Sequence, residues 1–249
     1  MRYQAARERI GTLDCVVIRP EAAVRSAALG VFCHGFGAGG DDLVGLAGEI
    51  LQVAMPQQPV TLVCPAALLS LEDQGLPGSR AWWLLSIQRL LSALEEGRYD
   101  QVREEVPEGI EEARAQLGAT ISLALDRCEL DESKLLLGGF SQGAMLAVET
   151  ACLGLPQPPQ QLCLYSGALI CEGRWKPVAS RLKHTQIFQS HGRMDPILPL
   201  QTGQWLRDML RAQGCQVDFV EFNGPHTIPA TAITHTAKLL AELARKPEQ

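Results

Sequence analysis

The chain has 249 residues and a formal net charge of −6, with 46% hydrophobic and 20% charged residues. This acidic balance, without a block of Lys or Arg, argues against a nucleic-acid surface or an anionic membrane patch and favours a small or neutral partner. The length suits a single α/β unit and no segment is as long and apolar as a membrane span, so we expect one domain over residues 1–249 and no transmembrane segment.

Short apolar segments alternate with longer helical patterns along the chain. Segments rich in Val, Leu, Ile, Phe or Cys predict strands over residues 13–18, 29–33, 60–64, 134–137, 161–165, 185–189 and 217–222. Helices are predicted between them, over residues 42–53, 103–128, 142–153, 201–213 and 230–244. The alternation predicts an α/β fold with a mostly parallel central sheet and helices on both faces, and the first of these strands is expected to be an antiparallel edge.

The longest helical pattern carries an apolar stripe at steps of three and four residues: Val106, Ile110, Ala113, Leu117, Ile121 and Ala124. This spacing places the stripe on one helix face, which we expect to pack against the sheet. Residues 67–99 fit the alternation least well, because turn residues, two adjacent tryptophans and a Leu-rich run follow one another there. Two interpretations stay open for this segment, one more packed helix or a lid or wall beside the functional site.

Eight cysteines are scattered through the chain, several of them inside apolar strand-like segments. We expect buried thiols rather than a disulfide framework. No Cys-x-x-Cys pair and no Cys/His cluster at zinc spacing is present, so no metal site is expected. The first residues lack the apolar core of a signal peptide, and together these features predict a cytoplasmic protein.

The most informative motif is Gly-Phe-Ser-Gln-Gly at residues 139–143, which joins an apolar strand to a helical pattern. Gly-x-Ser-x-Gly in this context is typical of a nucleophile elbow, a sharp turn that exposes the serine hydroxyl. We expect glycine at 139 and 143 because a side chain at either position would collide with the neighbouring strand or helix. Ser141 also lies at a helix N-terminus, where free N–H groups favour negative charge near its oxygen.

A second glycine-rich motif, Gly-Phe-Gly-Ala-Gly-Gly, covers residues 35–40 after a predicted strand. It satisfies the Gly-x-Gly-x-x-Gly pattern of dinucleotide-binding loops, but the acidic residue expected at the end of the next strand is missing. The alternative is an oxyanion hole, which needs two N–H donors held in place. The backbone N–H groups of Phe36 and Gln142 are the candidate donors, and His34 is expected to brace the loop.

A serine nucleophile needs a histidine base and an acid that orients the histidine. His226 is the favoured base, because it follows the last predicted strand in a loop built from turn residues. His191, at the carboxyl end of the preceding strand, competes for this role. Asp195 lies in the loop after that same strand and is the favoured acid. The chain order Ser141, Asp195, His226 is the nucleophile, acid, base order of α/β-hydrolases.

Three segments together resemble the phospholipase/carboxylesterase family of α/β-hydrolases, which includes the acyl-protein thioesterases. They are GFSQGAM at residues 139–145, HGFGA at 34–38 and HGRMDPILP at 191–199. The resemblance implies a compact hydrolase without a cofactor, acting on carboxylic esters or thioesters through an acyl-enzyme. The expected partner is therefore a small acyl ester or thioester.

By this resemblance Ser141, Asp195 and His226 form the triad, and Phe36 and Gln142 supply the oxyanion donors. The family carries a Trp-aromatic segment near the acyl site, so we take three residues as candidates for the substrate pocket: Trp82, Trp83 and Met145. The chain departs from the family pattern at two positions, where Leu84 replaces an Asp and Pro225 replaces the Gly before the base.

Other functions stay open at this point. A triad does not specify the leaving group, so lysophospholipid or amide hydrolysis remains an alternative, as does a non-catalytic ligand-binding protein on the same fold. The acyl chain length and the oligomeric state are not determined by the sequence.

Overall fold

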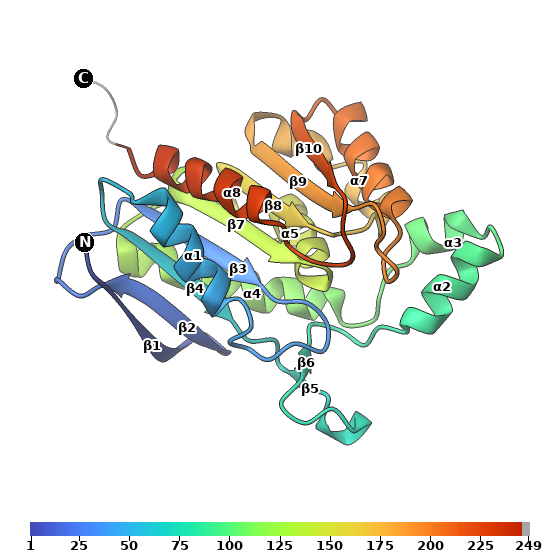
Figure 1. Ribbon diagram of the computed structural model, residues 1–249, viewed down its shortest axis with the longest axis horizontal. Helices are drawn as coiled ribbons and strands as arrows, with labels where there is room; N and C mark the ends of the chain where they lie inside the picture. Colours follow the sequence, from blue (N-terminus) through green and yellow to red (C-terminus); the bar gives the residue numbers. More distant parts are fainter. Residues whose placement is uncertain (246–249) are drawn as a thin grey trace.

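A computed structural model describes residues 1–245, through which an eight-stranded sheet runs in the order β1-β2-β4-β3-β7-β8-β9-β10 (Figure 1). Its strands are β1 (Tyr3–Ile10), β2 (Leu13–Pro20), β3 (Ala28–Cys33), β4 (Val60–Pro65), β7 (Leu135–Phe140), β8 (Gln161–Tyr165), β9 (Gln186–Gly192) and β10 (Val217–Phe222). Neighbouring strands from β4 through β3 to β10 pair in parallel, whereas β1 and β2 add an antiparallel hairpin beside β4. The predicted α/β class with a mostly parallel sheet is confirmed.

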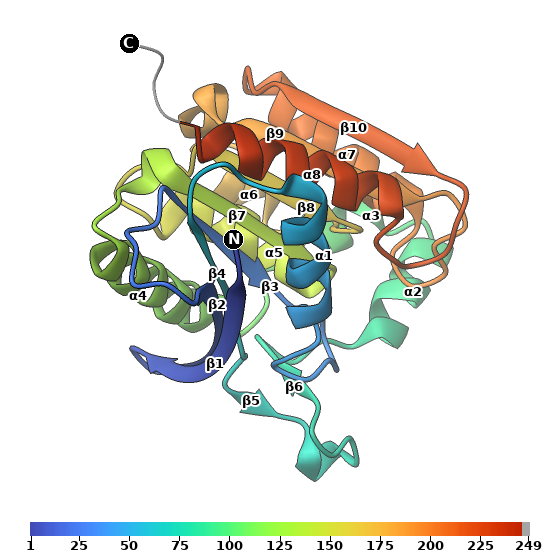
Figure 2. The same cartoon turned by 60° about the vertical axis from the view of Figure 1, so that its left-hand side comes forward.

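Helices cover both faces of the sheet (Figures 1 and 2). On one face, α1 (Val44–Ala54) and α8 (Ala230–Leu243) lie side by side over one hydrophobic cluster. On the other face, α4 (Ile110–Cys128), α5 (Gln142–Leu153) and α7 (Leu200–Ala212) contribute to a second cluster. Every residue of β3, β4 and β8 is buried between these layers, which explains their nearly continuous apolar sequences.

The remaining elements are short. Residues 67–99 hold a small hairpin and one helix rather than a single packed helix. The short strands of the hairpin are β5 (Leu69–Ser70) and β6 (Arg80–Ala81). The short helices of the chain are α2 (Ile87–Glu95), α3 (Tyr99–Glu104) and α6 (Glu172–Trp175), and 3-10 turns lie at Glu72–Gln74, Glu132–Lys134 and Ala179–His184. Among the residues that the structure describes, none of the helices combines the length and apolarity that crossing a membrane requires. The domain expected from the sequence also includes residues 246–249, which lie outside the described residues.

Two predictions about the elements are wrong. The edge of the sheet is β1, not the strand predicted over residues 13–18, which becomes the internal strand β2. No strand was predicted for β1, because its sequence is mostly polar and only Ile10 in it is buried, as suits an edge strand. The helix predicted over residues 103–128 starts at Ile110, because Pro107 disfavours helical backbone at residue 106 and Gly109 has a left-handed φ of 90°. Val106 therefore leaves the predicted stripe and is 48% exposed, while the other members of the stripe are buried.

A buried carboxylate ties α5 to its neighbours. Glu149 on α5 is fully buried and accepts hydrogen bonds from Arg114 Nη1 at 2.8 Å, Arg174 Nη2 at 3.0 Å and Trp175 Nε1 at 2.6 Å. These donors come from α4 and α6, so one charge links three helices. Since a buried carboxylate is stable only when it is paired and hydrogen-bonded, this network fixes the position of α5 and of the turn that precedes it.

Glu149→Ala is expected to lower the free energy of unfolding by about 3 kcal/mol, because it leaves two guanidinium groups without their buried partner. Glu111→Ala is the matched control, since Glu111 pairs with Arg174 but is 68% exposed, and it is expected to cost less than about 1 kcal/mol. Chemical denaturation of both variants gives the comparison. Equal losses would contradict the anchoring role of the buried network.

Candidate active site

Ser141 occupies a strained turn between β7 and α5. Its φ is 56° and its ψ is −118°, a conformation that costs a non-glycine residue free energy and is held by the surrounding packing. A Cβ at Gly139 would lie 2.3 Å from the carbonyl oxygen of Gly143, and a Cβ at Gly143 would lie 2.1 Å from that of Cys33. Both glycines are therefore required by close backbone approach, as predicted from the motif.

The loops after β9 and β10 bring Asp195 and His226 together. Nδ1 of His226 lies 2.6 Å from Oδ2 of Asp195 and donates its hydrogen to it. The two loops also bond through their backbones, since the N–H of Arg193 donates to the carbonyl of Phe222. At Gly192 a Cβ would meet the carbonyl oxygen of the residue before His226 at 2.4 Å, so a glycine is needed where the loops meet.

Asp195 is surrounded by hydrogen-bond donors. Its Oδ1 accepts from the backbone N–H groups of Ile197 at 2.9 Å and Leu198 at 2.8 Å. Burial by itself raises the pKa of this carboxyl, but the hydrogen bonds from His191, His226 and the Leu198 N–H outweigh burial and hold the pKa well below its ordinary value. Asp195 is thus ionised at neutral pH, which orients the His226 imidazole and stabilises its protonated form.

Ser141 and His226 line one cavity of about 310 Å³ at the carboxyl ends of the strands. The His226 ring also packs on the ring of Phe140, with 4.7 Å between the centroids. The other residues around the cavity are Gly35, Phe36, Gly37, Ala38, Asp42, Leu85, Ile197 and Leu198. Of the predicted site residues, the structure therefore gathers Ser141, His226 and Phe36 in one cavity, with Asp195 bonded to His226.

The two candidate oxyanion donors belong to the loop after β3 and to the first turn of α5. Gln142 is the first residue of α5, where a backbone N–H has no acceptor within the helix. Phe36 lines the cavity in a loop that His34 braces: Nε2 of His34 accepts from Ala67 N–H at 3.0 Å, so Nδ1 carries the hydrogen and donates to Gly35 O at 2.8 Å. Burial lowers the pKa of His34, which keeps the ring neutral in this role.

The tryptophan pair and Met145 do not line the cavity beside Ser141. Trp82, Trp83 and Met145 are 4%, 0% and 1% exposed, and all three belong to the core. The Gln142 side chain holds the tryptophan backbone, since its Oε1 accepts from Trp82 N–H at 3.0 Å and its Nε2 donates to Trp83 O at 2.8 Å. Trp82 borders a separate cavity of about 920 Å³, which shares Leu85 with the smaller one.

Three apolar residues around this cavity were not among the predicted site residues: Leu85, Ile197 and Leu198. Leu85 is one leucine within a Leu-rich run, and nothing in the run distinguishes it from its neighbours. Ile197 and Leu198 follow Asp195 closely, so the loop that carries the acid was the available signal for them.

His191 does not line the cavity and so does not replace His226 beside the serine. It is fully buried, and its Nε2 lies 2.7 Å from the carbonyl oxygen of Leu198 and 3.4 Å from Oδ2 of Asp195. This histidine contacts the acid rather than the nucleophile.

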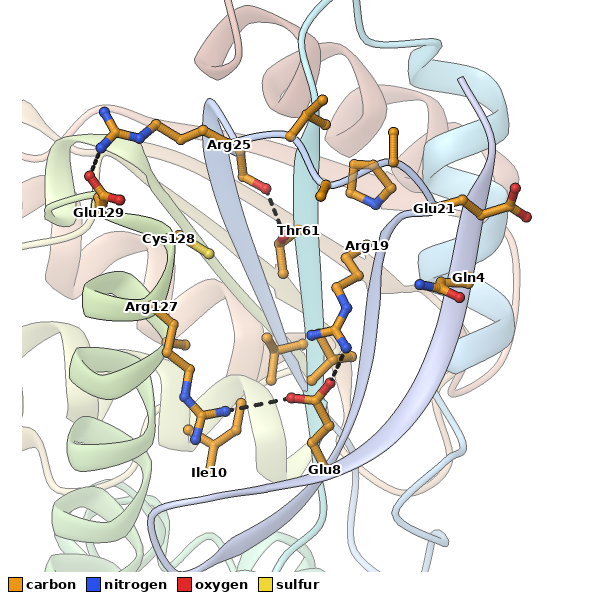
Figure 3. A pocket seen from close by; sticks show the side chains of 18 residues that line it. Gln4, Glu8, Ile10, Arg19, Glu21, Arg25, Thr61, Arg127, Cys128 and Glu129 are labelled. Atoms are coloured by element: carbon orange, nitrogen blue, oxygen red, sulfur yellow. Dashed lines mark hydrogen bonds and ion pairs between the residues drawn. The ribbon is translucent and has the colours of Figure 1, made fainter.

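A further cavity of about 490 Å³ lies at the opposite end of the sheet, between the β1–β2 hairpin and the end of α4 (Figure 3). Charged side chains across it pair with one another, Glu8 with Arg19 at 2.7 Å and with Arg127 at 3.5 Å. Its polar floor is likewise paired, since the hydroxyls of Ser26 and Thr61 lie 2.7 Å apart. None of the candidate triad residues borders it. In the part of the chain that the structure describes, no group of three or more His, Cys, Asp or Glu side chains is arranged to hold a metal ion.

Comparison with known proteins agrees with this geometry. A family described as Phospholipase/Carboxylesterase matches residues 13–243, which is most of the chain. The chain belongs to this family. It is therefore a hydrolase, and the resemblance inferred from the three sequence segments is confirmed.

One curated relative and several solved structures match almost the whole length of the chain. The acyl-protein thioesterase 1 of Mycosarcoma maydis is 25% identical over 257 residues, spanning 95% of this chain and 98% of the relative. Among solved structures, a carboxylesterase from Mesorhizobium loti is 18% identical with a TM-score of 0.73, covering 95% of this chain and 98% of its own. The Zea mays acyl-protein thioesterase 2 is 23% identical with a TM-score of 0.66, and the match covers 93% of this chain and 99% of the maize protein. At these identities the two structures support the fold.

Gly143→Ala is expected to destabilise the protein by about 3 kcal/mol or more, because the added methyl group would overlap a backbone carbonyl of β3 that cannot turn aside. Gly48→Ala in α1 is the control, since a Cβ there meets nothing within 4 Å, and it is expected to raise stability by up to about 1 kcal/mol through helix propensity. Urea denaturation distinguishes them. A Gly143→Ala protein as stable as the parent would contradict the close approach of α5 to β3.

Proposed function

We propose that this protein hydrolyses carboxylic esters or thioesters through an acyl-enzyme on Ser141. The observation that carries the proposal is the 2.6 Å hydrogen bond from His226 to Asp195 at a cavity that His226 shares with Ser141. A serine at a strained strand-to-helix turn, a histidine at the same cavity and a carboxylate behind the histidine are the parts that nucleophilic acyl transfer needs.

In the proposed reaction His226 acts first as base and then as acid. Nδ1 is held by Asp195, so Nε2 is the nitrogen that takes the Ser141 proton once the hydroxyl comes within hydrogen-bond distance. The serine oxygen attacks the acyl carbonyl, and the N–H groups of Phe36 and Gln142 stabilise the negative oxygen that forms. Protonated His226 then gives its proton to the leaving alcohol or thiol. Water, deprotonated by the same imidazole, hydrolyses the acyl-enzyme and frees the serine.

The substrate class rests on the family and on the names of relatives. The family joins phospholipases and carboxylesterases, and the relative from Mycosarcoma maydis is an acyl-protein thioesterase. Esters and thioesters react at the same acyl carbonyl, so one triad serves both. A small acyl ester or thioester is accordingly the proposed substrate, with no nucleic acid involved.

Residues 67–99 are proposed to form one wall of the substrate site within a single domain. The segment reaches the catalytic cavity through Leu85, which also borders the larger cavity of about 920 Å³. The lining of that larger cavity is mixed, with Leu68 and Trp82 among its apolar side chains and Arg89 and Glu112 among its charged ones. Leu85 therefore borders both the cavity of the proposed nucleophile and a second space of ligand size.

We also propose that the protein works in the cytoplasm. Its eight cysteines are free thiols, and all but Cys128 are buried. Unpaired thiols in this number suit a reducing compartment, because oxidising compartments favour disulfides.

Ser141→Ala is expected to lower the hydrolysis of a p-nitrophenyl ester by about 10⁴-fold or more and to abolish labelling by a fluorophosphonate probe. Ser122→Ala, which changes a serine of α4, should leave both unchanged. Peptide mapping of the labelled parent protein checks that the probe sits on residue 141. Activity of Ser141→Ala within about tenfold of the parent would refute the proposed nucleophile.

Leu85→Trp is expected to shift preference toward short acyl chains, because the larger ring would fill space at the wall that the two cavities share. Activity on acetyl and butyryl esters should change little, while activity on decanoyl and longer esters should fall by about tenfold or more. Leu84→Trp is the matched control, since Leu84 is 60% exposed and borders only the larger cavity. A parallel fall for all chain lengths in Leu85→Trp would contradict the role of Leu85 in the wall.

A further inference from the structure

His191 lies directly behind the candidate acid, although the proposed reaction does not use it. It is the second-to-last residue of β9 and is fully buried, and its Nε2 lies 2.7 Å from the Leu198 carbonyl oxygen, with which it forms a hydrogen bond, and 3.4 Å from Asp195 Oδ2. Its other nitrogen, Nδ1, is buried without a hydrogen-bond partner. A buried polar side chain in such a position needs an explanation, because a hydrophobic residue would fill the space without leaving a nitrogen unpaired.

The contacts determine which nitrogen carries the hydrogen. Nε2 faces only acceptors, so it must be the donor, and neutral His191 then has a bare lone pair on Nδ1. Gly203 of α7 lies against this lone pair, since a Cβ there would be 2.3 Å from Nδ1. A protonated ring would bury a second N–H with no acceptor, which is costly. His191 is therefore a neutral Nε2–H donor.

Asp195 Oδ2 thus faces two imidazoles. The shorter contact comes from Nδ1 of His226 and the longer from Nε2 of His191, while Oδ1 is held by two backbone N–H groups. Because both oxygens are held, the carboxylate group cannot rotate freely. The titratable and charged groups that face this cluster are the two histidines, Asp195 itself and Asp42 across the cavity.

We propose that His191 is a positioning residue: its Nε2–H holds the Leu198 carbonyl oxygen and so fixes the loop whose N–H groups bind Asp195, while the same N–H lies 3.4 Å from Asp195 Oδ2. This inference rests on the proposed function, since it acts through the triad. In the proposed reaction His191 thereby affects how Asp195 faces the proposed base, both through the loop geometry and through the nearby Nε2–H. It touches neither the substrate nor the reacting atoms.

A matched pair of variants tests the N–H group separately from the ring. The Gln side chain in His191→Gln carries an N–H at the same number of bonds from Cα as Nε2, whereas the Met side chain in His191→Met has the same length without a donor. Both remove the ring, so their packing losses are similar. His191→Gln is expected to keep kcat within about threefold of the parent, and His191→Met to lower kcat by about tenfold or more with little change in KM.

The pH profile provides a readout that a purely structural role would not move. Without the Nε2–H of His191, the imidazole of His226 is the side chain that still faces Asp195 Oδ2, so the carboxylate attracts the proton of the proposed base more strongly. The acid limb of kcat/KM is therefore expected to move to higher pH in His191→Met but not in His191→Gln. His184→Met, at an exposed histidine, controls for the substitution itself.

The double variant His191→Met with Asp195→Asn tests whether His191 acts through the carboxylate. Asp195→Asn alone should cost orders of magnitude in kcat, and adding His191→Met should then cost less than about twofold more. A full additional loss would overturn the inference, as would His191→Met behaving like His191→Gln. Ser141→Ala separates a failure of the proposed function from a failure of this inference. If Ser141→Ala retains activity, the proposed function fails. If Ser141→Ala is inactive while His191→Met and His191→Gln have the same activity, only the inference about His191 fails.

Nuclear magnetic resonance of the unmodified protein gives a test that needs no variant to fold. With ¹⁵N-labelled histidine, His191 should appear at neutral pH as the neutral Nε2–H tautomer. The Nδ1–H tautomer or an imidazolium at this position would overturn the inference.

Discussion

The close approach of α5 to the end of β3 is the constraint on which the site depends. The backbone of the first turn of α5 lies so near the carbonyl of Cys33 that residue 143 has no room for a side chain. This contact forces the chain to turn sharply at Ser141, which brings the hydroxyl to the end of the sheet and points the first free N–H groups of the helix to the same place. Buried Glu149 holds the same helix at its far end through α4 and α6.

The sheet then brings the other components to this position without further strain. Parallel strands end at the same edge, so the loops after β3, β9 and β10 meet the turn after β7. Backbone hydrogen bonds between the last two loops fix the separation of Asp195 and His226, and each group around Asp195 is a donor. The charge that the proposed reaction needs is thus stabilised before any substrate binds.

Much of this arrangement is predictable from the sequence, because its causes are local. The Gly-x-Ser-x-Gly motif, the apolar strands and the strand-end loops of Asp195 and His226 identify the fold and the candidate triad, and the bounds of β8, β10 and α5 agree with the structure. What the sequence leaves out depends on distant packing. The polar edge strand β1 has no apolar alternation to reveal it. The two tryptophans suggest a pocket beside Ser141, but they are buried in the core and their backbone bonds to the Gln142 side chain, while Trp82 borders only the larger cavity. The place of His191 behind Asp195 depends on α7, which lies later in the chain.

The segment over residues 67–99 is inserted between β4 and α4 and meets the site at few points. It touches α5 through the Gln142 amide and borders the cavity of Ser141 and His226 through Leu85, while the candidate triad residues stand on other parts of the chain. Sequence change in this segment can consequently alter which molecules fit without disturbing the machinery that cleaves them. Members of the family can then differ in substrate specificity while they catalyse the same type of reaction.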